Sequence, residues 1–476
     1  MATTTAALIS ELRSAIGAER VSIDPADRVV YSYDGAWAEG RPAVVLHPAT
    51  TRHVAEILRI ADRECIPIVP RGAATGLAGG AVPVEGAWCL NLARMNRILD
   101  VSAADSVAVA QPGVVTTTLQ QESEKHGLFY PPDPASLHMS TIGGNVSTNA
   151  GGPRCLKYGV TGDYVLGLEI VLPGGRVMRT GRRTIKDVSG YNLTSLFVGS
   201  EGTLGVITEV TLKLIPKPAA QATALAAFPR LAEACEAVGR ILASGIVPLV
   251  TELMDQAVTR AVAAFQSEPA YARRGTRTRL PVEAEAVLLV AVDGDRDQVE
   301  RDIDVIAGVL RDSGASEVQR ARDTAEAETL WEARRSVSPA IMRLAHDKFS
   351  EDIAVPRGQI PRMVERIQKI AKEHDLHIAV YGHIGDGNLH PTILCDRRDA
   401  AMLKRVQSAA AAIFDAVIDL GGSITGEHGI GIAKVDHVRR STDPIALEAM
   451  LAIKRLFDPN GIMNPGKKLP VGISER

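Results

Sequence analysis

The chain has 476 residues, more than one hydrophobic core usually holds, so we expect at least two domains. Its 46% hydrophobic and 23% charged residues are typical of an ordinary globular protein. A formal net charge of -3 gives no reason to expect nucleic acid or an anionic membrane as a partner.

The N-terminus and the cysteines bear on the compartment. Ala6 to Ile16 is interrupted by Glu11 and Arg13, which predicts an amphipathic helix and not a signal peptide, and no apolar run reaches the roughly 20 residues that span a bilayer. The five cysteines are scattered, which suits a reducing compartment and excludes a cysteine-ligated iron–sulfur cluster within this chain. We therefore expect a cytoplasmic protein, and any such cluster must belong to a partner.

The first half of the chain, to about Pro218, alternates short β-prone runs with glycine-rich loops. This layout predicts a loop-rich ligand-binding domain. An alternating apolar run from Val206 to Ile215 ends at Lys217-Pro218, which indicates a domain boundary. The other strands are predicted at 43–46, 66–70, 88–92 and 107–110.

Three glycine-rich segments lie in this half. Pro70 to Gly80 follows an apolar strand, and its small residues let consecutive backbone N–H groups approach an anion such as a phosphate. Thr141 to Gly152 adds amide and hydroxyl side chains, and Gly199 to Gly205 permits a close strand approach. None of them matches the Rossmann or P-loop pattern. Any one segment is equally well explained as a tight turn, but three in one domain predict a long ligand that carries a diphosphate.

From Ala222 the pattern changes to alternating strands and helices. This succession predicts an antiparallel sheet with helices on one face, as a substrate or cap domain. The strands are predicted at 224–228 and 286–292 and the helices at 231–243 and 299–313, followed near the C-terminus by a helix at 450–457. A polar surface loop is predicted at 267–279, with Arg273, Arg274, Arg277 and Arg279.

The tightest chemical signature is formed by His383 and His390, which flank a glycine turn between two β-prone runs. The turn predicts a hairpin across which the two imidazoles face each other, with Cβ atoms roughly 5 Å apart. Glu427, in a glycine-flanked turn beside His428, is the best candidate for a third ligand. Two imidazoles and a carboxylate with one open position predict a catalytic zinc site. The alternative is a set of hydrogen-bonded histidines in a glycine-rich loop.

Motifs from all these segments resemble, over nearly the whole chain, the FAD-linked oxidases of the vanillyl-alcohol oxidase and p-cresol methylhydroxylase superfamily. Within it, the chain is most similar to the group of glycolate oxidase, D-lactate dehydrogenase and D-2-hydroxyglutarate dehydrogenase. The motifs that carry the resemblance are 70–80, 131–134 with 141–152, 157–159, 199–205, 381–391 and 421–431.

The resemblance implies an α+β fold in three parts. A two-subdomain FAD-binding domain of the p-cresol methylhydroxylase type (PCMH-type) would occupy residues 1–218. A cap or substrate domain with an antiparallel sheet and helices would occupy 219–420, and a C-terminal segment, 421–476, would return to the flavin.

The resemblance also implies where FAD lies. The pyrophosphate would lie on the 70–80 loop, the flavin and ribityl chain along 136–152, and the adenine end near 201–207. Because the pyrophosphate loop has neither histidine nor cysteine, we expect FAD to be bound non-covalently. The implied cofactor-binding residues are Pro70, Arg71, Gly72, Ala73, Ala74, Thr75, Gly76, Leu77, Gly79, Ser136, Gly143, Gly144, Asn145, Thr148, Asn149, Gly152, Glu201, Gly205, Ile207 and Asn464.

The reaction implied is that of an FAD-dependent D-2-hydroxyacid dehydrogenase, which oxidises the hydroxy acid to a 2-oxo acid. The metal, held by His383, His390 and Glu427, would acidify the substrate hydroxyl, and His428 would take its proton as the α-hydrogen leaves as hydride to flavin N5. Zinc suits a site whose electrons go to flavin, although the same ligands could hold manganese or iron(II). The resemblance places Arg334, Ser338, Lys348 and Asn388 around the substrate carboxylate.

Several alternatives stay open. The substrate could be D-lactate, glycolate, D-2-hydroxyglutarate or a bulkier acid, and the 388–394 and 421–428 runs favour the first two. The electron acceptor could be a quinone, a cytochrome, an electron-transfer flavoprotein or an iron–sulfur subunit, and a homodimer is one option for the oligomeric state. The rival functions are an alkylglycerone-phosphate synthase-like FAD transferase, a metal-dependent hydrolase without flavin, and a non-catalytic flavoprotein subunit of an electron-transfer complex.

Overall fold

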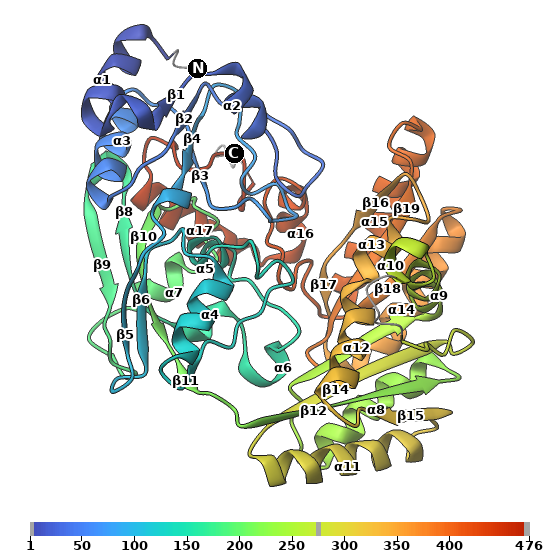
Figure 1. Cartoon of the computed structure of the whole chain (residues 1–476). Coiled ribbons are helices and arrows are strands. Elements are labelled where there is room, and N and C mark those ends of the chain that lie inside the picture. Colours follow the sequence, from blue (N-terminus) through green and yellow to red (C-terminus); the bar gives the residue numbers. More distant parts are fainter. Residues whose placement is uncertain (1–3, 273–277, 471–476) are drawn as a thin grey trace. The chain divides into compact units, whose positions relative to one another are not determined.

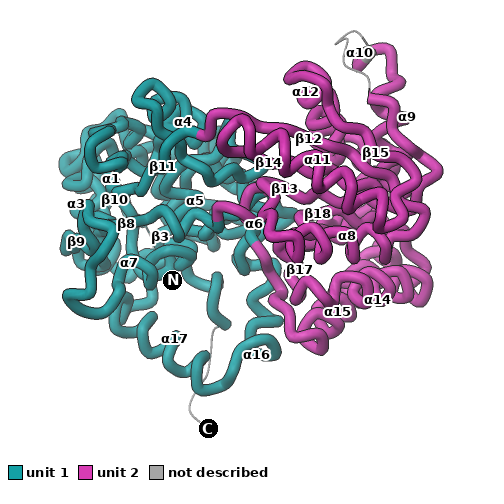
Figure 2. The backbone as a smooth tube through the Cα atoms, turned by 90° about the horizontal axis from the view of Figure 1, so that it is seen from below, with its two compact units in different colours: residues 1–152, 159–217, 427–476 teal, residues 153–158, 218–426 magenta. Residues whose placement is uncertain are grey.

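The computed structural model describes residues 4–272 and 278–470, so Arg273, Arg274 and Arg277 of the predicted surface loop lie outside the described residues. The chain divides into two compact units (Figure 2). Unit 1 comprises residues 1–152, 159–217 and 427–476, and unit 2 comprises residues 153–158 and 218–426. Within the described ranges, no helix is both long and apolar enough to cross a membrane.

The first sheet of unit 1 has the order β1-β2-β4-β3. Strands β2 (Val44–Leu46), β4 (Trp88–Asn91) and β3 (Ile68–Arg71) are parallel, and β1 (Val21–Ser22) is antiparallel at the edge. Every residue of β2 and β4 is buried, as expected for parallel strands covered on both faces. Helices α1 (Ala6–Ile16) and α3 (Thr51–Arg63) contribute to the core beside this sheet.

The second sheet of unit 1 is antiparallel, with the order β5-β6-β10-β8-β9. Helix α5 (Ile142–Thr148) packs against β10 (Val206–Lys213), whose mostly alternating burial reflects one covered face. The remaining elements of this part are α2 (Pro25–Val30), β5 (Ile98–Ser102), β6 (Val107–Ala110), α4 (Thr116–Glu124), β7 (Leu128–Phe129), β8 (Val165–Val171), β9 (Val177–Gly181), α7 (Leu193–Phe197) and β11 (Ile215–Pro216).

The C-terminal stretch completes unit 1 (Figure 1, red). It contains α16 (Val438–Ser441) and α17 (Pro444–Phe457), whose first N–H groups bond to the Asp443 side chain. Beyond α17 the chain runs beside β3, where Ile68 N donates to Ile462 O at 2.8 Å and Asn464 N donates to Ile68 O at 2.8 Å. Residues 462–464 therefore extend the first sheet beside β3.

Unit 2 is built on one antiparallel sheet with the order β15-β12-β14-β13-β18-β19-β16, and β17 also pairs with β19. Its strands, in chain order, are β12 (Ala220–Phe228), β13 (Val250–Asp255), β14 (Ala286–Gly294), β15 (Glu317–Arg320), β16 (Asp347–Ser350), β17 (Ile353–Ala354), β18 (His377–His383) and β19 (Asn388–Cys395). Its helices are α6 (Cys155–Tyr158), α8 (Leu231–Ala243), α9 (Gln256–Gln266), α10 (Pro269–Ala272), α11 (Arg296–Asp312), α12 (Thr324–Arg335), α13 (Val337–Ile341), α14 (Ile360–Glu373) and α15 (Ala400–Asp419).

Helices cover both faces of this sheet, so the prediction of helices on one face was wrong. Leu225 and Leu289 point into a core shared with α9, α12 and α13. Their strand neighbours Ala226 and Leu288 point the other way and are also fully buried, and α8 and α11 pack against these strands. The continuous apolar run in β14 is the pattern of a strand buried on both faces.

Candidate functional site

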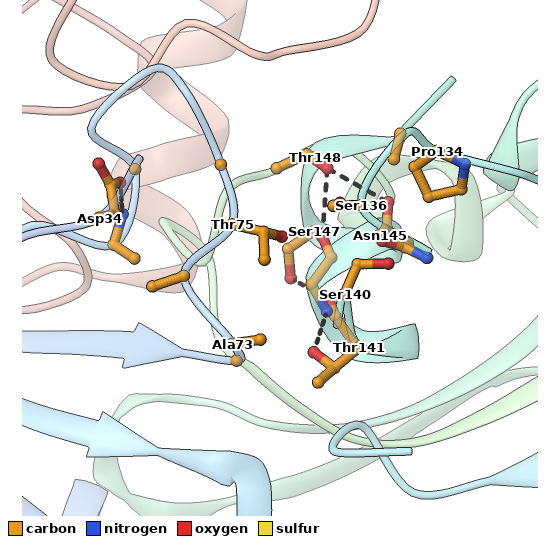
Figure 3. A pocket seen from close by; sticks show the side chains of 18 of the residues that line it. Asp34, Ala73, Thr75, Pro134, Ser136, Ser140, Thr141, Asn145, Ser147 and Thr148 are labelled. Carbon is orange, nitrogen blue, oxygen red and sulfur yellow. Dashed lines mark hydrogen bonds between the residues drawn. The ribbon is translucent and has the colours of Figure 1, made fainter. Parts of the chain in front are cut away.

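A cavity in unit 1 lies between the 72–81 loop after β3 and the segment around α5. Figure 3 shows Ala73 and Thr75 on one side of it and Ser136, Asn145 and Thr148 on the other. Many of the predicted cofactor-binding residues therefore line one cavity. These are Pro70, Arg71, Gly72, Ala73, Ala74, Thr75, Gly76, Leu77, Ser136, Gly143, Gly144, Asn145, Thr148 and Glu201.

Two glycines allow the walls of this cavity to approach each other closely. A Cβ on Gly72 would lie 2.4 Å from Thr141 Oγ1, which accepts a hydrogen bond from Gly144 N and so caps α5. A Cβ on Gly143 would lie 2.4 Å from Pro112 Cβ and 2.9 Å from Pro112 Cα. The glycine-rich sequences thus place two backbone segments side by side.

The other predicted cofactor-binding residues are not among the residues that line the cavity. Asn149 ends α5 in the left-handed conformation, and its Oδ1 accepts from Gly162 N at 2.8 Å. Gly152 lies against Asp133 O, where a Cβ would come within 2.4 Å. The remaining members of this group are Gly79, Gly205, Ile207 and Asn464.

Glu201 and Asn464 tie three loops of unit 1 together. The Glu201 carboxylate accepts from Ile430 N at 2.9 Å and from Gly431 N at 2.7 Å. The Asn464 amide donates to Gly80 O at 2.9 Å and to Glu201 O at 2.7 Å. These bonds hold the glycine run that follows His428 beside the 72–81 loop.

Glu427 and His428 line the same cavity as the predicted pyrophosphate loop. His428 Nε2 lies 3.6 Å from Glu427 Oε1, and both side chains are only partly exposed. Ile432 N donates to Ala78 O at 2.8 Å, which anchors the segment after these two residues. An imidazole side chain therefore reaches the cavity.

Asp34 also lines the cavity and has no distinctive motif around it in the sequence. Its carboxylate accepts from Ala36 N at 2.8 Å and Ala81 N at 3.2 Å. Burial raises the pKa of Asp34, although these backbone N–H groups oppose the shift. A lone aspartate in a turn offers no pattern by which sequence reasoning would find it.

In unit 2, the predicted hairpin forms from β18 and β19, and it brings His383 and His390 together. Both side chains are buried, and their ring centroids are 5.2 Å apart. The predicted register was wrong, because His390 lies opposite Tyr381 and His383 is displaced by two residues along its strand. Gly382 permits the close approach of the two strands at this point, since a Cβ there would lie 2.4 Å from Asn388 O.

Glu252 was missed by the sequence reasoning and lies directly opposite His383 across β13 and β18. It is fully buried, with Oε1 against His383 Nδ1 and Oε2 2.5 Å from Arg334 Nη2. Burial by itself would raise the pKa of Glu252, but the Arg334 and His383 side chains together hold it below its usual value. Arg334 also lies over the Tyr381 ring, with its Cζ 5.3 Å from the centroid. Only 14% of the Arg334 side chain is exposed.

Two more predicted substrate-binding residues meet where Lys348 of β16 reaches Ser338 of α13. Lys348 Nζ donates to Ser338 Oγ at 2.6 Å. Burial lowers the pKa of Lys348. This pair presents an ammonium group and a hydroxyl, which are both donors suited to a carboxylate.

Asn388, the fourth predicted substrate-binding residue, donates to Asp352 Oδ1 at 2.7 Å and to Ile353 O at 2.9 Å. Asp352 is fully buried, and its other oxygen accepts from Thr425 Oγ1 and Gly426 N, both at 2.8 Å. Asp352 also lies 3.9 Å from His390 Nδ1. Sequence reasoning missed this residue, which fixes the backbone immediately before Glu427.

The family comparisons cover both units. Residues 42–181 match the FAD binding domain, and residues 217–468 match the C-terminal domain of FAD linked oxidases. The chain is 44% identical over 452 residues to the glycolate oxidase subunit GlcD of Bacillus subtilis (strain 168), across 95% of this chain and 94% of the relative. It is 36% identical over 433 residues to a D-lactate dehydrogenase of Anaerostipes hadrus, across 90% of each chain. It is 33% identical over 475 residues to the D-2-hydroxyglutarate dehydrogenase of Stutzerimonas stutzeri (strain A1501), across 97% of this chain and 98% of the relative.

Solved structures with lower identity show the same fold. p-Cresol methylhydroxylase with substrate bound matches with a TM-score of 0.81 at 19% identity, across 97% of this chain and 96% of that one. Alkyldihydroxyacetonephosphate synthase matches with a TM-score of 0.76 at 19% identity, across 97% and 86%. The predicted α+β fold of the p-cresol methylhydroxylase type is thus confirmed. The chain belongs to the FAD-linked oxidases, in the group of glycolate oxidase GlcD, D-lactate dehydrogenase and D-2-hydroxyglutarate dehydrogenase.

Proposed function

We propose that this protein oxidises a D-2-hydroxy acid, of the D-lactate, glycolate or D-2-hydroxyglutarate type, to the 2-oxo acid. The observation that carries the proposal is that His428 lines the same cavity as the glycine-rich loops of the FAD-binding domain. Bound FAD supplies the hydride acceptor. His428 takes the hydroxyl proton as the general base.

The substrate carboxylate is assigned to Arg334, Ser338 and Lys348, with Asn388 nearby. Arg334 is held by Glu252 and by stacking on Tyr381, so little side-chain freedom remains to be lost when a carboxylate binds. The hydrogen bond of Lys348 goes to a neutral hydroxyl, so its positive charge is available to balance the substrate. These contacts support recognition of the acid group and leave the choice among the three acids to the side-chain pocket.

His383, His390 and Glu427 are assigned to a divalent cation, for which zinc is the best-suited metal. Two buried imidazoles with ring centroids 5.2 Å apart fit such an ion, and the contact of His383 Nδ1 with Glu252 directs its Nε2 away for coordination. Glu427 follows Gly426, whose N–H is fixed by Asp352. A divalent cation would acidify the hydroxyl that His428 deprotonates.

The test is to mix the purified FAD-loaded protein anaerobically with a panel of D- and L-2-hydroxy acids and to follow flavin absorbance near 450 nm, with and without a chelator. Bleaching by a D-acid that the chelator abolishes is expected. A yellow protein that no hydroxy acid bleaches would contradict the assigned reaction, and bleaching that survives metal removal would contradict the assigned metal.

Two variants separate the roles of the histidines. His428→Ala should keep bound FAD and metal but lose flavin reduction, whereas His383→Ala should lose metal and activity together. Metal content by mass spectrometry, flavin content by absorbance and anaerobic reduction measure these three properties. Retained turnover in either variant would contradict the assignment.

A further inference from the structure

We propose that Glu252 is a positioning residue that serves the metal and the substrate at the same time, because one carboxylate holds both His383 and Arg334. The inference rests on the proposed function, since it assigns His383 to the metal and Arg334 to the substrate carboxylate. The observed contacts of the Glu252 carboxylate are with these two assigned residues.

The geometry is set by strand pairing. The register of β13 and β18 places Glu252 opposite His383, and Glu252 is fully buried. Oε1 contacts His383 Nδ1, while Oε2 lies 2.5 Å from both Arg334 Nε and Arg334 Nη2. The carboxylate is thus shared between a side chain of the sheet and a side chain of α12.

The contact with His383 selects the imidazole tautomer that can bind a metal through Nε2. The carboxylate accepts a hydrogen bond from Nδ1–H, which leaves the lone pair on Nε2 and makes Nε2 a more basic ligand. Loss of such a carboxylate partner typically weakens metal binding by about 10- to 100-fold.

The contact with Arg334 determines which part of the guanidinium serves the substrate. Glu252 is bonded through the Nε and Nη2 edge, so the Nη1 end of the fork remains for a substrate carboxylate. Without the carboxylate of Glu252, Arg334 loses the charged partner that orients it. Glu252 therefore couples the position of Arg334, which is assigned to the substrate carboxylate, to the position of His383, which is assigned to the metal.

The substitution that tests this is Glu252→Gln, which keeps the size of the side chain. The neutral amide lacks the charge that makes His383 Nε2 a more basic ligand, and if its oxygen accepts from His383 Nδ1, its NH₂ group faces the donors of Arg334. Asp255→Asn is the matched control, because Asp255 is on the same strand and its carboxylate accepts backbone bonds from Val258 and Val380.

The first measurement is the Zn²⁺ dissociation constant of the metal-free, FAD-loaded protein, by competition with a chromophoric chelator and without any hydroxy acid. Glu252→Gln should weaken zinc binding by about 10- to 100-fold, and Asp255→Asn should change it by less than about twofold. Equal zinc affinity in wild type and Glu252→Gln would overturn the proposal. If Glu252→Gln does not fold, Glu252→Asp is used, which keeps the charge but is too short to hold both partners, and its zinc affinity decides by the same criterion.

The second measurement is kcat and KM for the acid that bleaches the flavin, at saturating Zn²⁺. A KM that stays at least fivefold raised in Glu252→Gln is expected, because zinc cannot restore the lost partner of Arg334. Return of KM to the wild-type value would show that Glu252 serves the metal alone, and would overturn the proposal that it also positions Arg334 for the substrate. If no hydroxy acid reduces the flavin although zinc binds, the proposed function fails while the zinc affinities still decide the role of Glu252 at His383.

Discussion

Asp352→Asn is expected to destabilise unit 2, because the buried carboxylate of Asp352 accepts hydrogen bonds from Asn388, Thr425 and Gly426 that an amide cannot all replace. Oδ1 accepts from Asn388, and Oδ2 accepts from Thr425 Oγ1 and Gly426 N. If the new NH₂ group faces Asn388, two amide donors meet, and turning the Asn388 amide removes its bond to Ile353 O. If the NH₂ group instead takes the place of Oδ2, it meets the Gly426 N–H donor, so at least one buried polar group is left unpaired in either arrangement.

An unpaired buried polar group costs about 1–3 kcal/mol. For a unit of this size, that corresponds to a fall in Tm of about 2–12 °C. The assay is thermal unfolding of wild type and variant, followed by circular dichroism under identical FAD and metal conditions.

The matched control is Asp399→Asn at the exposed N-cap of α15. Asp399 accepts from Ala401 N at 2.9 Å and Met402 N at 3.0 Å, and asparagine is an equally good N-cap residue. This variant should unfold within about 1 °C of wild type, since an exposed cap leaves nothing unpaired. An Asp352→Asn protein as stable as Asp399→Asn would refute the hydrogen-bond argument.

Two further predictions concern unit 1. Gly143→Ala forces a methyl group against Pro112 and should lower the free energy of unfolding of the FAD-free protein by about 1–3 kcal/mol. In the control Gly144→Ala, the new methyl group meets only Thr141 Oγ1 at 3.2 Å, so its effect should be near neutral. Equal Tm values for the two variants would contradict this prediction. Burial lowers the pKa of Lys467 to about 8, although Asp34 and Glu201 oppose the shift. The unfolded chain holds this proton more tightly, so the unfolding free energy of wild type relative to Lys467→Met should rise from pH 8 to pH 10.5, by up to about 3 kcal/mol. Urea unfolding at several pH values measures this difference, and a constant difference would show that the Lys467 ammonium is not destabilised by burial.

Local sequence patterns predicted most of what is local in this fold. The apolar runs predicted β2, β3, β4 and β6, and the glycine loops predicted where backbone segments approach one another around the cavity. These features depend on residues close together in the chain, so their pattern is visible without knowledge of the tertiary structure.

The acidic residues of the site could not be predicted in this way. Glu252 and His383 are 131 residues apart, and Asp352 and Thr425 are 73 apart, so each pair exists only through strand pairing or loop packing. The two-residue displacement of His383 from the position opposite His390 was missed for a related reason. The register depends on the close approach of Gly382 to the backbone of Asn388, and a turn motif alone does not reveal it.

The division of unit 1 among three stretches of chain has a consequence for how the protein is made. Ile68 in β3 bonds to Ile462 and Asn464, and Ala78 O accepts from Ile432 N, so the N-terminal sheet and the predicted pyrophosphate loop are completed by the last part of the chain. At about 5–20 residues per second, a ribosome needs roughly 10–40 s to pass from residue 217 to residue 427. During that time the nascent first sheet lacks this partner, so unit 1 is completed only after unit 2 has been synthesised.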